Sequence, residues 1–106
     1  MKGMGGGLQQ MMRQANQMQN KIKKLQEELA LREFEGTSGG GAVACKVTGD
    51  NKVMAIEIKP EVVNADDLEM LQEMIIAATN EALKAAKEIS DQEMSKITGG
   101  VGFPGL

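Results

Sequence analysis

Residues 8–29, LQQMMRQANQMQNKIKKLQEEL, place apolar side chains at alternating intervals of three and four positions. This heptad spacing is typical of an α-helix that packs along its length against another helix. At 1.5 Å per residue, a helix over residues 8–33 would be a rod of about 39 Å. Arg32 interrupts the apolar pattern near the end of this segment. The heptad seam comprises Leu8, Met11, Ala15, Met18, Ile22, Leu25 and Leu29.

The glycine-rich run at residues 36–41, GTSGGG, ends the helical pattern, and two strand-like segments follow. Residues 42–48 alternate, with Val43, Cys45 and Val47 on one face. Residues 52–59 alternate in the same way, and the short segment Gly49-Asp50-Asn51 predicts a hairpin turn between the two. Residues 33–36 are a candidate third strand before the glycines.

A second long helix is predicted after Pro60, with Asn64 as its N-cap and no glycine or proline before Gly99. Its expected buried stripe is Leu68, Leu71, Ile75, Ala78, Ala82, Leu83, Ala86 and Ile89. The order is therefore helix, two or three antiparallel strands, helix, in one α+β domain over residues 1–106 with flexible tails at 1–7 and 99–106. Because so small a chain buries only a thin core, we expect a homodimer.

The charges are unevenly distributed along the chain. The first 26 residues carry five basic side chains and no carboxylate, whereas the other 80 residues carry seven basic and 15 acidic side chains. A local cluster of positive charge attracts a polyanion whatever the overall net charge of −3. Either nucleic acid or an anionic membrane surface would fit. The basic residues of this N-terminal segment are Lys2, Arg13, Lys21, Lys23 and Lys24.

Other function classes find little support. The chain has no histidine, no Ser or Cys constellation with a plausible base, and a single cysteine, Cys45, which we interpret as a small buried hydrophobe. The glycines at 39–41 lead into a strand and lack the Lys-Ser/Thr pair of a phosphate-binding loop. We therefore predict no enzyme activity, no cofactor and no metal. No apolar run is long enough to span a membrane, and no secretion signal is evident.

The N-terminal segment favours nucleic acid over a membrane surface. Its polar face is filled by glutamine and asparagine, which hydrogen-bond phosphates and base edges, and it has no Trp, Phe or Leu on that face to insert into lipid. We predict that Lys2, Arg13, Lys21, Lys23 and Lys24 contact the nucleic acid. Lys21 and Lys24 share a face, and Lys23 points away from them.

Five stretches in the same order resemble the YbaB/EbfC family of bacterial nucleoid-associated proteins. They are residues 11–19 (MMRQANQMQ) after a glycine-rich start, 26–29 (QEEL), 36–49 (GTSGGGAVACKVTG), 70–82 (MLQEMIIAATNEA) and 99–105 (GGVGFPG). The resemblance implies an α-β-β-β-α protomer, whose sheets join two copies into an intertwined homodimer with projecting helical arms. It also implies binding of double-stranded DNA in the cytoplasmic nucleoid, with limited or variable sequence preference and with roles in chromosome organisation or gene expression.

An alternative from another class is a coiled-coil protein-binding module, such as a prefoldin-like holdase or adaptor. Such a module needs an exposed apolar surface near the tips of its arms, whereas both predicted helical seams are expected to be used in packing. Salt would discriminate, because binding to DNA weakens with ionic strength and hydrophobic binding of a client protein does not.

Overall fold

The computed structural model describes residues 2–99, with side chains from residue 7 onward. Helix α1 (Lys2–Leu31) leads into strands β1 (Glu33–Ser38), β2 (Val43–Thr48) and β3 (Val53–Ile58), and helix α2 (Leu68–Thr98) follows. The 3-10 turn η1 (Gly39–Gly41) joins β1 to β2, and the 3-10 turn η2 (Pro60–Val62) lies between β3 and α2. The predicted α-β-β-β-α order is confirmed, including the third strand. Helix α1 starts at Lys2, earlier than predicted, and the tail at 100–106 lies outside the described residues.

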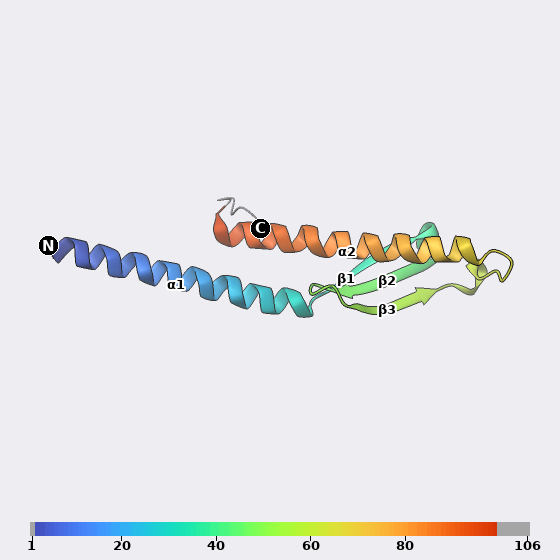
Figure 1. The fold of residues 1–106 in the computed structure, drawn as a ribbon, viewed down its shortest axis with the longest axis horizontal. Coiled ribbons are helices and arrows are strands. Elements are labelled where there is room, and N and C mark those ends of the chain that lie inside the picture. The colour runs from blue at the N-terminus through green and yellow to red at the C-terminus, as the bar shows by residue number, and fades with distance from the viewer. Residues whose placement is uncertain (1, 100–106) are drawn as a thin grey trace.

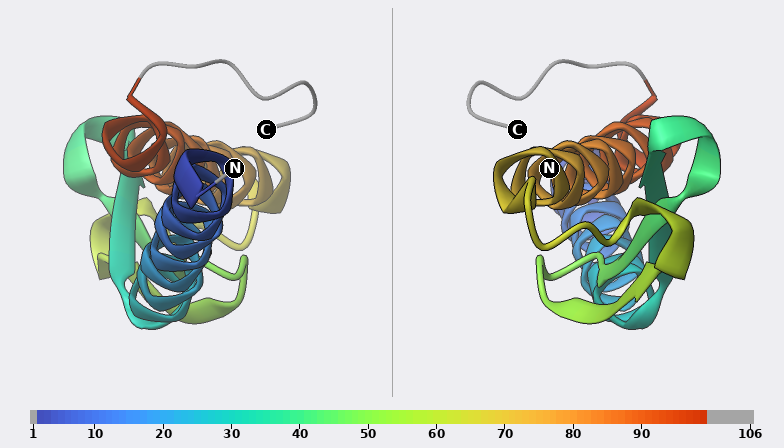
Figure 2. Two further views of the ribbon diagram at one scale, coloured as in Figure 1. Left: turned by 90° about the vertical axis from the view of Figure 1, so that its left-hand side faces the viewer. Right: turned by 90° about the vertical axis from the view of Figure 1, so that its right-hand side faces the viewer.

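The three strands form an antiparallel sheet in the order β1-β2-β3. Val47 pairs with Phe34 of β1, and Cys45 pairs with Ile56 of β3, so these side chains lie on one face of the sheet. Helix α2 covers that face above β1 and β2 (Figure 2). Val43, Cys45 and Val47 are fully buried there, as their alternation predicts.

Small residues let α2 approach the sheet closely. Its fully buried positions are Ala78, Ala82 and Ala86, while Leu71 and Ile75 are only half-buried. A Cβ atom on Gly36 of β1 would fall on the carbonyl oxygen of Ala78 and the amide nitrogen of Ala82. The helix axis therefore lies near the strand because Gly36 has no side chain.

Two expectations for α2 were wrong. Leu68 is 52% exposed, because the first turn of α2 extends past the ends of the strands (Figure 1). The N-cap is Asp67, whose carboxylate accepts a hydrogen bond from the Met70 amide at 3.2 Å, and not Asn64. The Asn64 side chain instead accepts from the Asp66 amide at 2.9 Å, in a turn that precedes the helix.

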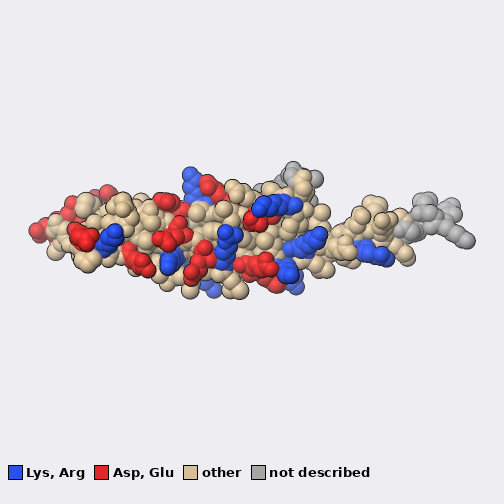
Figure 3. All heavy atoms as spheres, turned by 180° about the vertical axis from the view of Figure 1, so that it is seen from behind, with Lys and Arg blue, Asp and Glu red and all other residues tan. Residues whose placement is uncertain are grey.

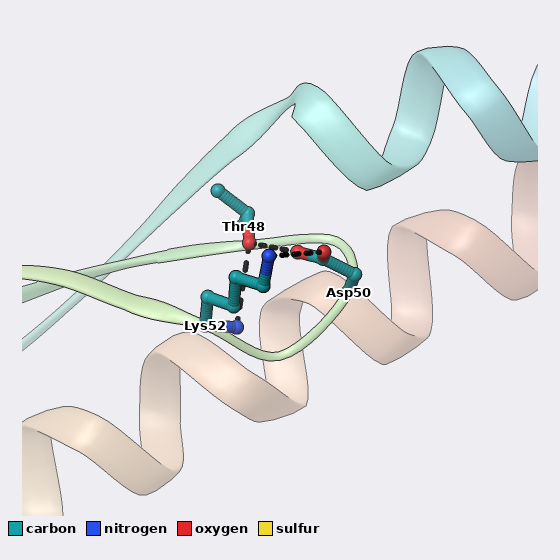
Figure 4. A network of polar contacts seen from close by, with 3 residues as sticks. All are labelled: Thr48, Asp50 and Lys52. Atoms are coloured by element: carbon teal, nitrogen blue, oxygen red, sulfur yellow. Dashed lines mark hydrogen bonds and ion pairs between the residues drawn. The ribbon is translucent and has the colours of Figure 1, made fainter.

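The turn between β2 and β3 holds the end of α1. Within the turn, the Thr48 hydroxyl donates to Asp50, and Lys52 completes the network with its amide 3.3 Å from Thr48 Oγ1 and its Nζ 3.6 Å from Asp50 (Figure 4). The Gly49 amide donates to the carbonyl of Arg32 at 3.1 Å. A Cβ on Gly49 would fall on the carbonyl of Leu29, so the turn lies directly against the last turn of α1.

Helix α1 leaves the body of the protein as an arm (Figure 1). The molecule measures 80 × 21 × 17 Å and its radius of gyration is 20.9 Å, against about 13 Å for a compact chain of this length. Along the heptad seam, Leu29 is buried, Ile22 and Leu25 are half-buried, and every residue nearer the tip is exposed. Packing along the whole length of the seam, which the spacing predicted, is therefore absent from the described part of the single chain, because α1 extends beyond the end of α2.

Candidate nucleic-acid interface

The base of the arm fixes which face of α1 points outward. Leu25 packs against the buried core, and Leu29 is part of it. Successive residues advance by about 100° around a helix, so the side of α1 opposite this seam faces away from α2 and the sheet. That outward side carries the cationic residues.

The structure places four of the five predicted DNA-binding residues on the exposed surface of α1. Arg13, Lys21, Lys23 and Lys24 are all exposed, and about 16 Å of helix separates Arg13 from Lys24. Lys2 belongs to the first turn of α1, but its side chain is outside the described part. The five positions occupy an arc of roughly 160° centred opposite the seam. Lys21 and Lys24 lie toward one side of the arc, and Lys23 lies toward the other, as predicted.

These cations differ from those of α2 in their neighbours. On α2, Lys84, Lys87 and Lys96 lie 3.9, 3.2 and 3.0 Å from the carboxylates of Glu88, Asp91 and Glu93. Among the side chains described from residue 7 to residue 99, no carboxylate lies within 4.0 Å of the four cations of α1. The positive charge of the arm is therefore less compensated by neighbouring acids than that of α2.

The space-filling view shows the same separation. On the face drawn in Figure 3, red carboxylates gather over the body, while the described part of the projecting arm shows blue but no red. The first carboxylates of α1 are Glu27 and Glu28, at its base. A polyanion that approaches the molecule is attracted to the arm and repelled by the body.

Other chemistry is not evident in the described residues. Within residues 2–99 no three His, Cys, Asp or Glu side chains group as metal ligands. Cys45 is fully buried between Val43 and Val47, in agreement with its interpretation as a small core residue. None of the described helices is apolar over a length that would cross a membrane.

Comparison with known proteins decides the family. A family model described as the YbaB/EbfC DNA-binding family matches residues 4–101. The chain belongs to this family. The YbaB/EbfC family consists of DNA-binding proteins and is not an enzyme family, so the site to be explained is a surface for DNA.

Relatives support the assignment. A nucleoid-associated protein of Pelotomaculum thermopropionicum is 50% identical over 103 residues, which cover 97% of this chain and 98% of that protein. A nucleoid-associated protein of Clostridium acetobutylicum is 49% identical over 105 residues, covering 98% and 94%. The fold is similar to that of the uncharacterized protein HP0035 of Helicobacter pylori, with a TM-score of 0.67, 23% identity and coverage of 89% and 92%.

The sequence reasoning overlooked one property of this YbaB/EbfC arm. The cationic residues are centred opposite the heptad seam, so residues 8–24 of α1 have an apolar side and a cationic, amide-rich side, and the first carboxylates follow at Glu27 and Glu28. A helical projection of residues 8–29 contains this information, because both sets follow from the same 100° step.

Proposed function

We propose that this protein is a non-enzymatic nucleoid-associated protein of the cytoplasm that binds double-stranded DNA as a homodimer, through the cationic sides of its two α1 arms. Its roles would lie in chromosome organisation or regulation of gene expression. The observation that carries the proposal is the exposed arm with Arg13, Lys21, Lys23 and Lys24 and no nearby carboxylate among the described residues. Lysine and arginine bind phosphates and release counterions, which supplies most of the affinity.

Dimerisation is supported by an incompletely covered side of the sheet. Strand β3 is an edge strand, and its Ile56 and Ile58 face the α2 side but are 43% and 36% exposed, since α2 lies over β1 and β2. On α2, Leu83 and Ala86 line a shallow hollow with Gly49 and Asn51 of the β2–β3 turn, so this flank of the helix is directed toward that turn. Ile76, about 50° from the mean direction of Leu83 and Ala86 around the axis, is 59% exposed.

A second copy of the chain could pair with the free edge of β3 and bury the exposed apolar side chains beside it. An unpaired strand edge offers backbone donors and acceptors to another strand, and exposed apolar side chains beside it favour burial. Joining two chains through their sheets would give two α1 arms per particle, each with its own cationic side.

One observation favours the second candidate, a holdase or adaptor. Leu8, Met11 and Met18 are 60%, 67% and 39% exposed, so the arm does carry an apolar surface near its tip. This differs from the expectation that the seam is fully used in packing. An apolar surface of this kind binds a client protein equally well at low and moderate ionic strength, whereas DNA binding to the cationic side weakens steeply.

The test measures the binding of a fluorescein-labelled random duplex by anisotropy over a range of salt concentrations. Replacing Lys21, Lys23 and Lys24 together with Gln should weaken binding and flatten the plot of log K against log salt by roughly 0.9 for each phosphate that the variant no longer binds. The matched control replaces Lys84, Lys87 and Lys96 with Gln, which removes the same charge from α2. Equal binding by the two triple variants would contradict the assignment of the DNA surface to α1.

A further inference from the structure

The side of α1 opposite the heptad seam carries a row of four polar side chains, three of which are amides that the phosphate-binding role does not explain. We define the polar stripe as Gln9, Arg13, Asn16 and Asn20. They follow one another at intervals of four, three and four residues, which places them within roughly 60° of one another around the helix. All four are exposed, and the stripe is about 16 Å long.

The composition of the polar stripe is unusual for a solvated helix surface. Such a surface is normally built from alternating Glu and Lys, which pair one turn apart and favour the helix. Asparagine is a poor helix former because its short amide competes for the backbone, yet Asn16 and Asn20 both stand in the middle of an unsupported arm. The stripe therefore favours particular hydrogen-bonding groups over helix stability.

Those groups match the edges of bases. Asparagine and glutamine can bond adenine N6 and N7 in two places at once, and arginine can bond guanine O6 and N7 in the same way. A helix about 10–12 Å in diameter fits the major groove of B-DNA, which is about 12 Å wide. A stripe of about 16 Å would extend over about five base pairs at roughly 3.4 Å per step.

The flanking lysines have the arrangement that such docking requires. Lys23 and Lys24 follow Asn20 and diverge by roughly 50° to either side of the polar stripe. The phosphates of the two strands form the two walls of the groove, so each lysine would face one wall. On this geometry the lysines set position, while the amides and Arg13 lie toward the floor of the groove.

We infer that α1 enters the major groove and reads base edges through Gln9, Arg13, Asn16 and Asn20, so that the protein prefers particular duplex sequences. The inference rests on the proposed function, because it assumes that α1 is the DNA-binding surface. It goes beyond that function, since charge alone gives affinity without a preference among sequences.

The experiment first selects duplexes from a random library with the full-length protein, and then compares the best duplex with a shuffled duplex of the same composition. The test variant is N16A/N20A, which changes no charge and favours the helix. The control is Q14A/Q19A, which removes two amides roughly 130° and 90° from the centre of the polar stripe.

We expect N16A/N20A to lose roughly tenfold or more of the preference for the selected duplex, while its affinity for the shuffled duplex changes by less than about twofold. The control should keep the preference. Substituting 7-deazapurines into the selected duplex removes the N7 acceptors of the major groove, and should abolish the preference of the parent protein.

The outcomes distinguish a failure of base reading by the polar stripe from a failure of DNA binding by α1. If the parent binds selected and shuffled duplexes equally, or if N16A/N20A keeps the full preference, then base reading by the stripe is overturned while DNA binding by the lysines stands. If 7-deazapurines leave the preference unchanged, the major-groove placement is wrong. If the parent protein binds no duplex at all, the proposed function falls and the inference falls with it.

Discussion

Single residues explain how the arm keeps its direction. Among the glycines described from residue 7 to residue 99, Gly36 and Gly49 are the two whose added Cβ would meet backbone atoms, the first between β1 and α2 and the second between the β2–β3 turn and α1. The glycine-rich segment 36–41 was predicted to end the helical pattern and to lead into the sheet, with Gly36 as the last residue of a candidate strand. The sequence did not reveal Gly36 as a contact site, because nothing local distinguishes a glycine needed for close packing from one needed for a turn.

We predict that Gly36→Ala destabilises the protein by several kcal/mol, because α2 would have to move away from the sheet and leave its alanines poorly packed. Gly7→Ala is the control. A Cβ at Gly7 meets nothing within 4 Å, and alanine in a helix is favoured over glycine by about 0.5–1 kcal/mol. Thermal melts followed by circular dichroism should therefore shift in opposite directions, and a parallel shift would contradict the close contact at Gly36.

The β2–β3 turn gives a prediction about pKa. The hydrogen bond from the Thr48 hydroxyl lowers the pKa of Asp50 below its usual value, and the charge of Lys52 adds to this effect. A lowered pKa contributes stability that is present above the usual aspartate pKa and is lost as the pH falls through the folded-state value. Thr48→Val should raise the pKa of Asp50, as NMR titration of the side-chain carboxyl would show. An unchanged pKa would mean that this hydrogen bond does not form in solution.

At the scale of elements, periodicity predicted the helices and strands well but not their partners. The alternation of residues 42–48 located β2 and its buried face. Successive side chains of a strand point to opposite faces, so on a sheet covered on one side the apolar set must face the cover. The heptad seam predicted a long helix, and α1 is that helix. The same seam could not indicate which part would be covered, because coverage depends on where α2 ends.

The two parts of the seam should respond differently to truncation. Leu29→Ala removes a core side chain that is only 6% exposed, and we expect a loss of about 2–5 kcal/mol in the free energy of unfolding. Met11 is 67% exposed, so Met11→Ala should change stability by less than about 0.5 kcal/mol. Urea titrations would measure both. A large effect at Met11 would indicate that the tip of the arm is packed in the assembled protein.

At the scale of the whole molecule, the elongated shape separates a cationic arm from a body in which acidic side chains outnumber basic ones. The cationic arm and the acidic body follow from a charge distribution visible in the sequence, and the structure adds that the two are separated in space (Figure 3). The proposed DNA-binding side of α1 could be predicted in outline for the same reason. The relative directions of Lys21, Lys23 and Lys24 could be predicted as well, because they follow from the helical step of about 100°. How far α1 projects from the body could not, because that depends on where α2 ends.

The last prediction concerns assembly, and it uses the α2-facing side of the sheet at β3, which α2 does not cover. Ile76 of α2 is 59% exposed and Ile56 of β3 is 43% exposed, so a charge at either position remains hydrated in the single chain. If that surface joins two copies, Ile56→Lys combined with Ile76→Lys would bury unpaired charges in the dimer and prevent it from forming. The parent should give about twice the chain mass of 11.3 kDa by light scattering, and the double variant should give the mass of one chain.

The matched control is Lys84→Gln with Lys87→Gln, which alters two exposed residues on the charged surface of α2. It should remain dimeric. Because two arms bind one duplex more tightly than one arm does, the monomeric variant should also show weaker DNA binding and a smaller salt slope, although its own arm is intact. A double variant that stays dimeric would place the interface elsewhere. A monomeric variant with unchanged DNA affinity would mean that each arm binds alone, and that the pairing of arms contributes nothing to the affinity.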